Sequence, residues 1–168
     1  ALETYLTPSR TQRIDEILKN RIQSIHIAVE SPYDIHNSLA VLRTAEALGL
    51  LHMHIIDMEG KKKSREVVSR GASCWMNLQY ADSLEDFAEL MHKERVIIAG
   101  ACLSEETIDL EDLPIDQKIC LLFGNEHSGL STEAIANCHY KFKVPMYGMT
   151  QSYNLSVSAA ISLYDIVK

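Results

Sequence analysis

The run KICLLF at residues 118–123 places five apolar residues after one lysine, and RVIIAGA at residues 95–101 is a second nearly uninterrupted apolar run. Neither run alternates between polar and apolar residues, as a strand with one face in water would. Continuous apolar strands of this length are typical of parallel sheets that are covered on both faces. The two runs therefore predict the centre of a parallel sheet.

Strand and helix patterns alternate through the rest of the chain. Further strands are predicted at 24–29, 51–57, 76–80 and 140–145, and helices at 9–21, 37–49, 64–71, 83–92, 131–138 and 154–167. This alternation predicts an α/β fold, with a mostly parallel sheet and helices on both faces.

Local signals refine two of these helices. Asn37 or Ser38 could cap the second helix, and Gly49 could end it. In the last helix, one side is expected to be buried, and it consists of Val157, Ala160, Ile161, Tyr164 and Val167.

Length and composition favour one domain over residues 1–168, with an N-terminal helix within 1–22. The chain has 168 residues, of which 46% are hydrophobic. No apolar run approaches the roughly 20 residues of a membrane span, and no signal-peptide pattern opens the sequence. We therefore expect a cytoplasmic protein.

Cysteine and histidine spacing gives no indication of a metal. The four cysteines lie far apart without a Cys-x-x-Cys pair, so reduced and mostly buried thiols are expected at Cys74, Cys102, Cys120 and Cys138. His52 and His54 share one face of a predicted strand, but two ligands without a third are weak evidence for a metal site.

The net charge of −7 argues against simple electrostatic attraction to nucleic acid. Much of the acid crowds into one apparent loop, at Glu105, Glu106, Asp109, Glu111, Asp112 and Asp116. Basic residues gather at Arg10, Arg13, Lys19 and Arg21, and at Lys61, Lys62, Lys63, Arg65 and Arg70. By itself, each charge run is more typical of a solvated face than of a binding site.

Polar segments directly after the predicted strands are the candidate functional sites, since ligands of parallel sheets bind beyond the carboxyl ends of the strands. These segments are ESPYDIHN (30–37), CLSEET (102–107) and GNEHSGLS (124–131). In the last of them, Gly124 and Gly129 allow a close approach of the backbone to a ligand. The adjacent Glu126, His127 and Ser128 do not suggest a hydrolase triad, because three successive side chains seldom converge.

Two further features stand out from their surroundings. Arg43 lies in a helix of mostly small and apolar residues; its guanidinium suits a phosphate, although its stem could also pack while the head stays in water. The stretch PMYGMTQSYNLSVSAAISLY at 145–164 places Ser152 and Asn154 before the last helix, among more polar groups than capping needs.

Three segments resemble, in order and spacing, the three motifs of the SpoU/TrmH family of RNA 2′-O-ribose methyltransferases, within the SPOUT superfamily. They are HNSLAVLRTAEALGL (36–50), LLFGNEHSGLS (121–131) and VPMYGMTQSYNLSVSAAISLY (144–164). The resemblance implies a C-terminal trefoil knot over about 118–168, which strand and helix patterns alone do not show. It also implies S-adenosyl-L-methionine as cofactor, a homodimer with active sites at the interface, and tRNA as substrate, with a D-loop guanosine favoured.

The resemblance also assigns roles to individual residues. Arg43 would be the central catalytic residue, together with Asn37, Glu126, Ser152 and Asn154. The cofactor would contact Ala101, Leu103, Gly124, Val144, Met146, Tyr153 and Leu155. The candidates for RNA binding come instead from the clusters of basic residues, and they are Arg10, Arg13, Lys61, Lys62, Lys63 and Arg65.

Arg43 holds its proton too tightly to act as a simple base, so our hypothesis is that it clamps an RNA phosphate and eases deprotonation of the neighbouring hydroxyl. Tyr153 departs from the family, which commonly has leucine at this position. The alternatives are another tRNA nucleotide or rRNA as target, and a non-catalytic member that binds RNA or cofactor. A flavodoxin-like nucleotide protein is a third alternative, but it would need a glycine turn where ESPYDIHN has none.

Overall fold

The computed structural model describes residues 6–57, 71–104 and 106–168, and it contains a seven-stranded sheet in the order β3-β2-β1-β6-β4-β7-β5. The strands are β1 (Ile22–Glu30), β2 (Leu50–Ile56), β3 (Asn77–Ala81), β4 (Ile97–Ala101), β5 (Ile108–Asp109), β6 (Ile119–Phe123) and β7 (Tyr140–Lys143). All pairs of these strands are parallel. The predicted α/β fold is thus confirmed, and the described sheet is entirely parallel.

The two apolar runs lie side by side near the middle of the sheet. β6 pairs with β1 on one side and with β4 on the other, and all five residues of β6 are buried. Its side chains point alternately into the two hydrophobic cores, with Leu121 in one core and Leu122 in the other. Burial on both faces is the reason that this strand shows no polar alternation.

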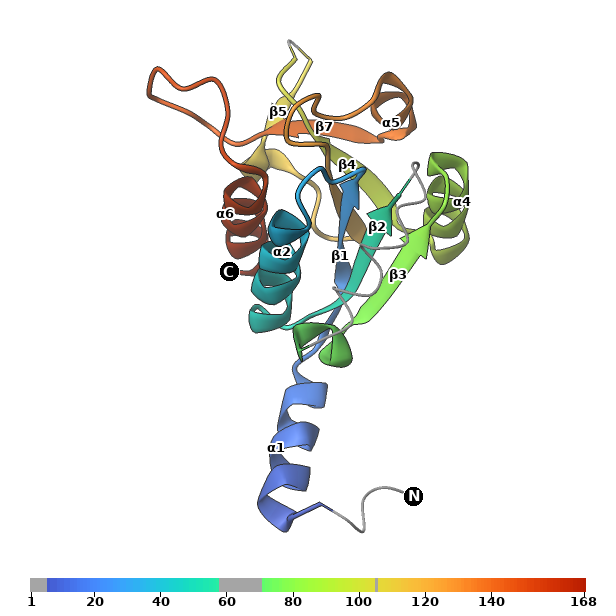
Figure 1. Cartoon of the computed structure of the whole chain (residues 1–168), viewed down its shortest axis with the longest axis vertical. Coiled ribbons are helices and arrows are strands. Elements are labelled where there is room, and N and C mark those ends of the chain that lie inside the picture. Colours follow the sequence, from blue (N-terminus) through green and yellow to red (C-terminus); the bar gives the residue numbers. More distant parts are fainter. Residues whose placement is uncertain (1–5, 58–70, 105) are drawn as a thin grey trace.

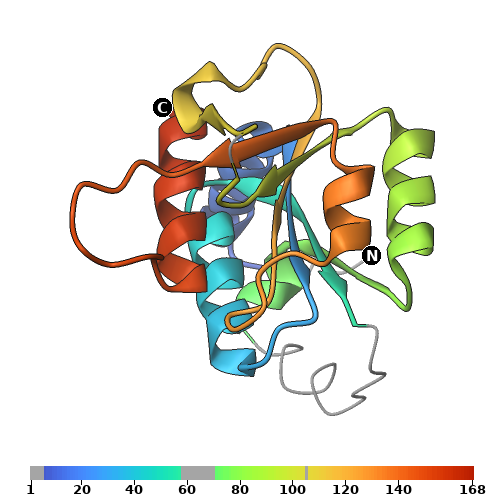
Figure 2. The same cartoon turned by 90° about the horizontal axis from the view of Figure 1, so that it is seen from above.

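Helices cover both faces of the sheet, as Figure 2 shows. The helices are α1 (Pro8–Lys19), α2 (Ile35–Ala47), α4 (Leu84–Glu94), α5 (Thr132–Asn137) and α6 (Leu155–Val167), with short 3₁₀ turns at η2 (Gly71–Trp75) and η3 (Leu110–Asp112). α2 and α6 pack side by side on one face, where Leu42 and Leu163 are buried. α4 and α5 cover the other face through Phe87, Met91 and Ala134.

α1 stands away from the sheet (Figure 1) and contains no buried residue. Arg21, which follows this helix, is tied to the body of the protein. Its guanidinium lies 2.9 Å from a carboxylate oxygen of Glu46 and donates to the Leu50 carbonyl at 3.0 Å. Arg21 therefore fixes the start of β1, and its side chain is not free to contact a ligand.

Two local predictions, the cap of α2 and the acidic loop, are corrected by the structure. The cap of α2 is Asp34, whose side chain accepts from the His36 N–H, so Asn37 lies within the helix. Gly49 follows the end of α2 as predicted and has a φ of +87°. The acidic loop contains β5 and η3, and ion pairs Lys141–Glu106 and Lys143–Asp109 join this loop to β7. The predicted helix at 64–71 lies almost entirely outside the described residues.

The predicted buried side of α6 is wrong. The buried residues are Leu155, Ala159, Ser162, Leu163 and Ile166. On the predicted side, Val157, Ile161 and Tyr164 are exposed, with 64% of Tyr164 accessible. The helix is apolar almost all round, so its periodicity did not distinguish the two sides. The small residues Ala159 and Ser162 are on the side that packs inward.

A buried histidine pair crosses from β1 to β2. His26 Nδ1 lies 3.0 Å from His54 Nε2, and both side chains are 1% exposed. The ring of His52 stacks on His26 with centroids 4.3 Å apart, and Phe87 contacts His54 edge-on. Among the described residues, no group of three or more potential ligands is arranged to hold a metal ion.

All four cysteines are free, but the expectation that they are mostly buried is wrong. Only Cys120 is fully buried, whereas Cys102 and Cys138 are half-buried and Cys74 is exposed. Burial raises the pKa of the Cys138 thiol to about 12, so this thiol stays protonated. In the parts of the chain that the structure describes, no helix has the length and apolar character of a membrane span.

Candidate active site

A cavity of about 580 Å³ lies at the carboxyl ends of β4, β6 and β7. Its lining comes from three segments, which follow these strands in the sheet. All seven residues predicted to bind cofactor line it, namely Ala101, Leu103, Gly124, Val144, Met146, Tyr153 and Leu155. Glu126, Ser152 and Asn154 also belong to its lining. The structure therefore gathers ten of the predicted site residues around one space.

The loop at 124–131 is shaped by close backbone contacts. A Cβ at Gly124 would lie 2.1 Å from the backbone of Gly129 and Leu130, so only glycine fits there. Asn125 and Gly129 exchange two backbone hydrogen bonds of 2.9 Å, and Gly129 has a φ of +69°. These contacts fold the loop back on itself and present Glu126 towards β1.

Glu126 is held by donors from the segment after β1. Its carboxylate accepts from the backbone N–H of Tyr33 at 2.8 Å and of Asp34 at 3.3 Å, and from Asn37 Nδ2 at 2.9 Å. Burial raises the pKa of Glu126, but the hydrogen bonds from Tyr33, Asn37 and Asp34 outweigh it and lower the net pKa. The carboxylate is therefore ionised at neutral pH.

Asn37 and Asn154 extend this network to the start of α6. Asn154 Nδ2 donates to Asn37 Oδ1 at 3.2 Å, while Asn154 Oδ1 caps α6 by accepting from the Ser156 N–H at 2.9 Å. A continuous chain of hydrogen bonds thus runs from α6 through Asn154 and Asn37 to Glu126. Each amide has its oxygen and nitrogen committed to different partners, which fixes its orientation.

Ser152 and Tyr153 lie in the segment between β7 and α6. Both are on the exposed rim of the cavity. The Tyr153 hydroxyl donates to the Pro145 carbonyl at 3.3 Å, and this bond links the two ends of the segment. A leucine at this position would leave that carbonyl without this donor.

Arg43 lies apart from the other predicted catalytic residues. It is exposed on α2 and lines a second, larger cavity of about 850 Å³, between α2, α6 and η3. Val144 belongs to the lining of both cavities, so they adjoin each other. Within one copy of the chain, the structure does not bring Arg43 to the Asn37–Glu126–Asn154 chain.

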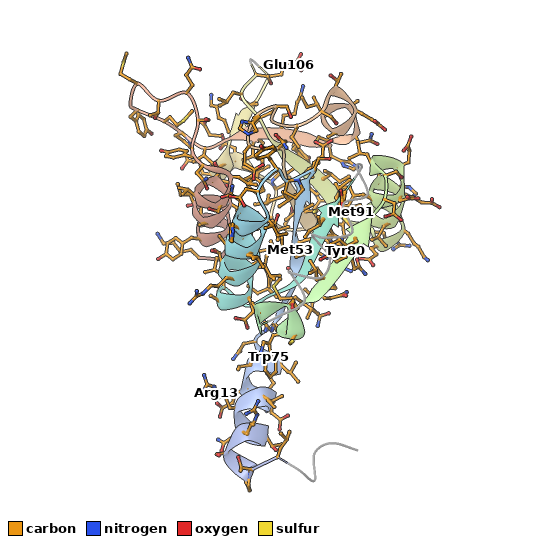
Figure 3. The ribbon with its side chains drawn as sticks, in the orientation of Figure 1. Arg13, Met53, Trp75, Tyr80, Met91 and Glu106 are labelled. Carbon is orange, nitrogen blue, oxygen red and sulfur yellow. The ribbon has the colours of Figure 1, made fainter. Side chains whose placement is uncertain are left out.

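Arg10 and Arg13, the two predicted RNA-binding residues that the structure describes, are not near the cavity. Arg10 and Arg13 are exposed on α1, at the amino-terminal end of β1, whereas the cavity lies at the carboxyl ends of the strands. Figure 3 shows Arg13 and Glu106 at opposite ends of the molecule. Lys61, Lys62, Lys63 and Arg65 lie outside the described residues.

Sequence reasoning did not identify three residues at the site. Asn125 orders its own loop, because its side-chain oxygen accepts from His127 N–H at 2.9 Å and from Ser128 N–H at 3.3 Å. Tyr33 and His127 form an edge-to-face ring pair beside Glu126. The position of Asn125 between glycines was a usable signal, but no pattern predicted which rings would meet.

The fold and the site together define a class of protein. A model of the SpoU rRNA Methylase family matches residues 24–164, and the chain therefore belongs to the SpoU methylase family. The chain is 32% identical over 166 residues to the "tRNA (guanosine(18)-2'-O)-methyltransferase" of Borreliella burgdorferi, covering 99% of this chain and 76% of that protein.

Solved structures agree with this assignment. A TrmH/SpoU tRNA modifying enzyme from A. aeolicus superposes with a TM-score of 0.84 at 29% identity, over 95% of this chain and 81% of that chain. The SpoU methyltransferase AviRb from Streptomyces viridochromogenes, in complex with the cofactor AdoMet, shares the fold with a TM-score of 0.71 at 23% identity. That match covers 88% of this chain and 57% of the AviRb chain.

Proposed function

We propose that this chain transfers a methyl group from S-adenosyl-L-methionine to a ribose 2′-hydroxyl of tRNA, with a guanosine of the D-loop as the favoured target. The names of the B. burgdorferi and A. aeolicus relatives support the reaction and the substrate. The observation that carries the proposal is the Asn154–Asn37–Glu126 chain beside a cavity lined by the predicted cofactor residues.

The cavity suits the cofactor in size and in lining. Small-molecule sites enclose about 300–1,000 Å³ and are mostly apolar, with a few polar groups. Gly124 and Leu155 would contact the cofactor from the lining, with Tyr153 at the rim. When bound, the cofactor supplies an electrophilic methyl group on a positively charged sulfur. We also propose that residues 118–168 form the trefoil knot, since segments after β6 and β7 line the same cavity.

The protein residues would orient the ribose and assist removal of its proton. Glu126 is ionised and fixed, so it holds the segment after β1 and Asn37 in a constant position. Ser152, exposed at the rim, has a hydroxyl available to ribose or phosphate. Arg43 would clamp a phosphate and so lower the cost of ionising the neighbouring 2′-hydroxyl. Alignment of the reacting atoms is the main contribution that such a site makes.

We further propose a homodimer with each active site at the interface. α6 exposes Val157, Ile161 and Tyr164. Tyr147, which lines the same cavity as Arg43, is 97% exposed. An apolar patch of this kind indicates a protein contact. Because Arg43 is separated from the cofactor cavity within one copy, we propose that it serves the cavity of a second copy.

Mixed dimers test this arrangement. The Arg43→Ala and Asn37→Ala chains should each be inactive alone, but a mixed dimer formed by refolding them together would contain one site with both residues intact. Methyl transfer should therefore reappear on mixing if Arg43 acts on the partner copy. No recovery in a verified mixed dimer would place Arg43 in the site of its own chain.

The reaction itself is tested with isotopically labelled cofactor. Label should enter total tRNA, and nucleoside mapping should place it on a 2′-O-methylated guanosine of the D-loop. Label on another tRNA nucleotide or on rRNA would show that the D-loop guanosine is not the target. If calorimetry shows cofactor binding but no RNA accepts label, the chain is a non-catalytic member of the family.

A further inference from the structure

An exposed aromatic pair lies directly beside the proposed catalytic residues. Tyr33, from the segment after β1, is 70% exposed, and His127, from the loop after β6, is also exposed. Their ring centroids are 4.7 Å apart and the rings are inclined by 77°. An edge-to-face pair adds little stability beyond burial, and most of the tyrosine surface remains in water.

The backbone holds both rings in place. Tyr33 N–H donates to Glu126 Oε2 at 2.8 Å, and His127 N–H donates to Asn125 Oδ1 at 2.9 Å. Asn125 Nδ2 also donates to the Ser31 carbonyl at 2.6 Å, which joins the two segments a second time. A planar ligand that stacks here would therefore order little additional chain.

The surrounding charge excludes a phosphate as the natural partner of this pair. Asp34 and Glu126 lie next to Tyr33 and His127, and both are acidic. Among the described residues that line the cavity, Lys143 is the single lysine or arginine. A nucleobase carries no charge and presents a flat face, so it can bind an aromatic ring where phosphate would be repelled.

We infer that Tyr33 and His127 form a stacking platform for an unpaired nucleobase of the RNA, next to the ribose that is methylated. The inference rests on the proposed function for the position of that ribose. Bases inside a helix cannot reach an aromatic side chain in this way, so the target nucleotide or its neighbour must be splayed out of its stack. The platform would therefore select single-stranded loops in the substrate.

Binding of a short RNA tests the platform without requiring methyl transfer. The probe is a single-stranded oligoribonucleotide that carries 2-aminopurine, whose fluorescence is quenched on stacking. Tyr33→Ala should weaken binding about 10- to 100-fold and abolish the quenching. Tyr33→Phe, the matched control, should behave like wild type, and His127→Ala should weaken binding less. Because the Glu126 contact is made by the Tyr33 backbone, Tyr33→Ala should leave cofactor binding in calorimetry unchanged.

The salt dependence separates stacking from phosphate contact. Loss of stacking should lower affinity while the slope of log K against log salt stays the same. A reduced slope in Tyr33→Ala, or unchanged affinity and quenching, would overturn the inference. If wild type stacks the probe but transfers no methyl group, the proposed function fails and the platform stands. If wild type methylates tRNA and Tyr33→Ala does so equally well at limiting RNA, the platform is wrong.

Discussion

Lowering the pH from 8 to 5 should strongly destabilise the fold through the buried His26–His54 pair. Burial and the neighbouring histidines lower the pKa of His54 to about 3, and burial and His52 lower that of His26 to about 4, from an ordinary value of 6.5. Below pH 6.5 the two histidines are therefore protonated in the unfolded chain but stay neutral in the folded chain. Stability is fully present above pH 6.5 and falls as the pH drops towards the folded values.

The loss in the free energy of unfolding depends on how far the pH lies below 6.5, the pKa of a histidine in the unfolded chain. Each pH unit below 6.5 costs about 1.4 kcal/mol per histidine until the folded pKa is reached. At pH 5 this amounts to about 2 kcal/mol for each residue, and about 4 kcal/mol for the pair. Such a loss is a large part of the roughly 5–15 kcal/mol that stabilises an ordinary domain. Burial also lowers the pKa of His52, while Glu94 and Lys118 act on it in opposite directions.

Urea unfolding followed by circular dichroism at pH 8, 7, 6 and 5 measures the effect above the range in which most carboxylates titrate. The double variant His26→Leu/His54→Met replaces both partners by apolar groups and should lose most of the pH dependence. His92→Gln, at an exposed histidine of α4, is the matched control and should keep the wild-type slope. A wild-type free energy that is constant from pH 8 to 5, or a double variant with the wild-type slope, would refute the reasoning.

Three further predictions concern the site. Asn154→Ser should keep the α6 cap and the stability to within a few tenths of a kcal/mol, but it should lose the amide N–H that reaches Asn37, and with it methyl transfer. Asn154→Ala should lose methyl transfer and, in urea unfolding, about 1 kcal/mol of stability as well. Equal activity of Asn154→Ser and wild type would contradict this. Arg43→Ala should reduce kcat about 10²- to 10³-fold with cofactor affinity unchanged in calorimetry. Near-full methyl transfer by this variant would contradict the hypothesis that Arg43 binds an RNA phosphate. Gly124→Ala should displace the loop, because its Cβ would lie 2.1 Å from backbone atoms, and calorimetry should detect no cofactor binding; wild-type affinity would mean that the loop adapts.

The central strands of the sheet were predictable because a strand that is buried on both faces has a continuous apolar sequence. Runs such as KICLLF have no polar alternation, and β6 is indeed buried along its whole length. β5 was missed since it has only two residues, Ile108 and Asp109, within an acidic segment. Its place at the sheet edge depends on pairing with β7 and on the Lys143–Asp109 contact, which are long-range interactions.

The cap of α2 and the inward side of α6 were mispredicted for different reasons. Asp34 and Asn37 are both good caps, and the hydrogen bond from Asn37 to Glu126, 89 residues away, is not encoded locally. In α6 both sides are apolar, so periodicity supports two solutions equally. The exposed side is where we propose a second copy binds.

The gathering of the site residues could be predicted in outline because each follows a strand of one parallel sheet. The carboxyl ends of such strands meet at one edge, so segments far apart in sequence converge there. What that rule does not give is which side chains touch. Arg43, on the helix, faces a different cavity from Glu126, although the resemblance placed them together.

Asn154 shows why the start of α6 carries an asparagine in particular. Capping requires only one side-chain oxygen, and serine or aspartate would supply it as well as asparagine does. Neither of those side chains could cap the helix and also donate a fixed N–H to Asn37. With Asn154 in place, the helix end and the ionised Glu126 are connected through one amide, so the packing of α6 also sets the geometry of the site. The presence of asparagine at this position is thus explained by the second bond of its side chain.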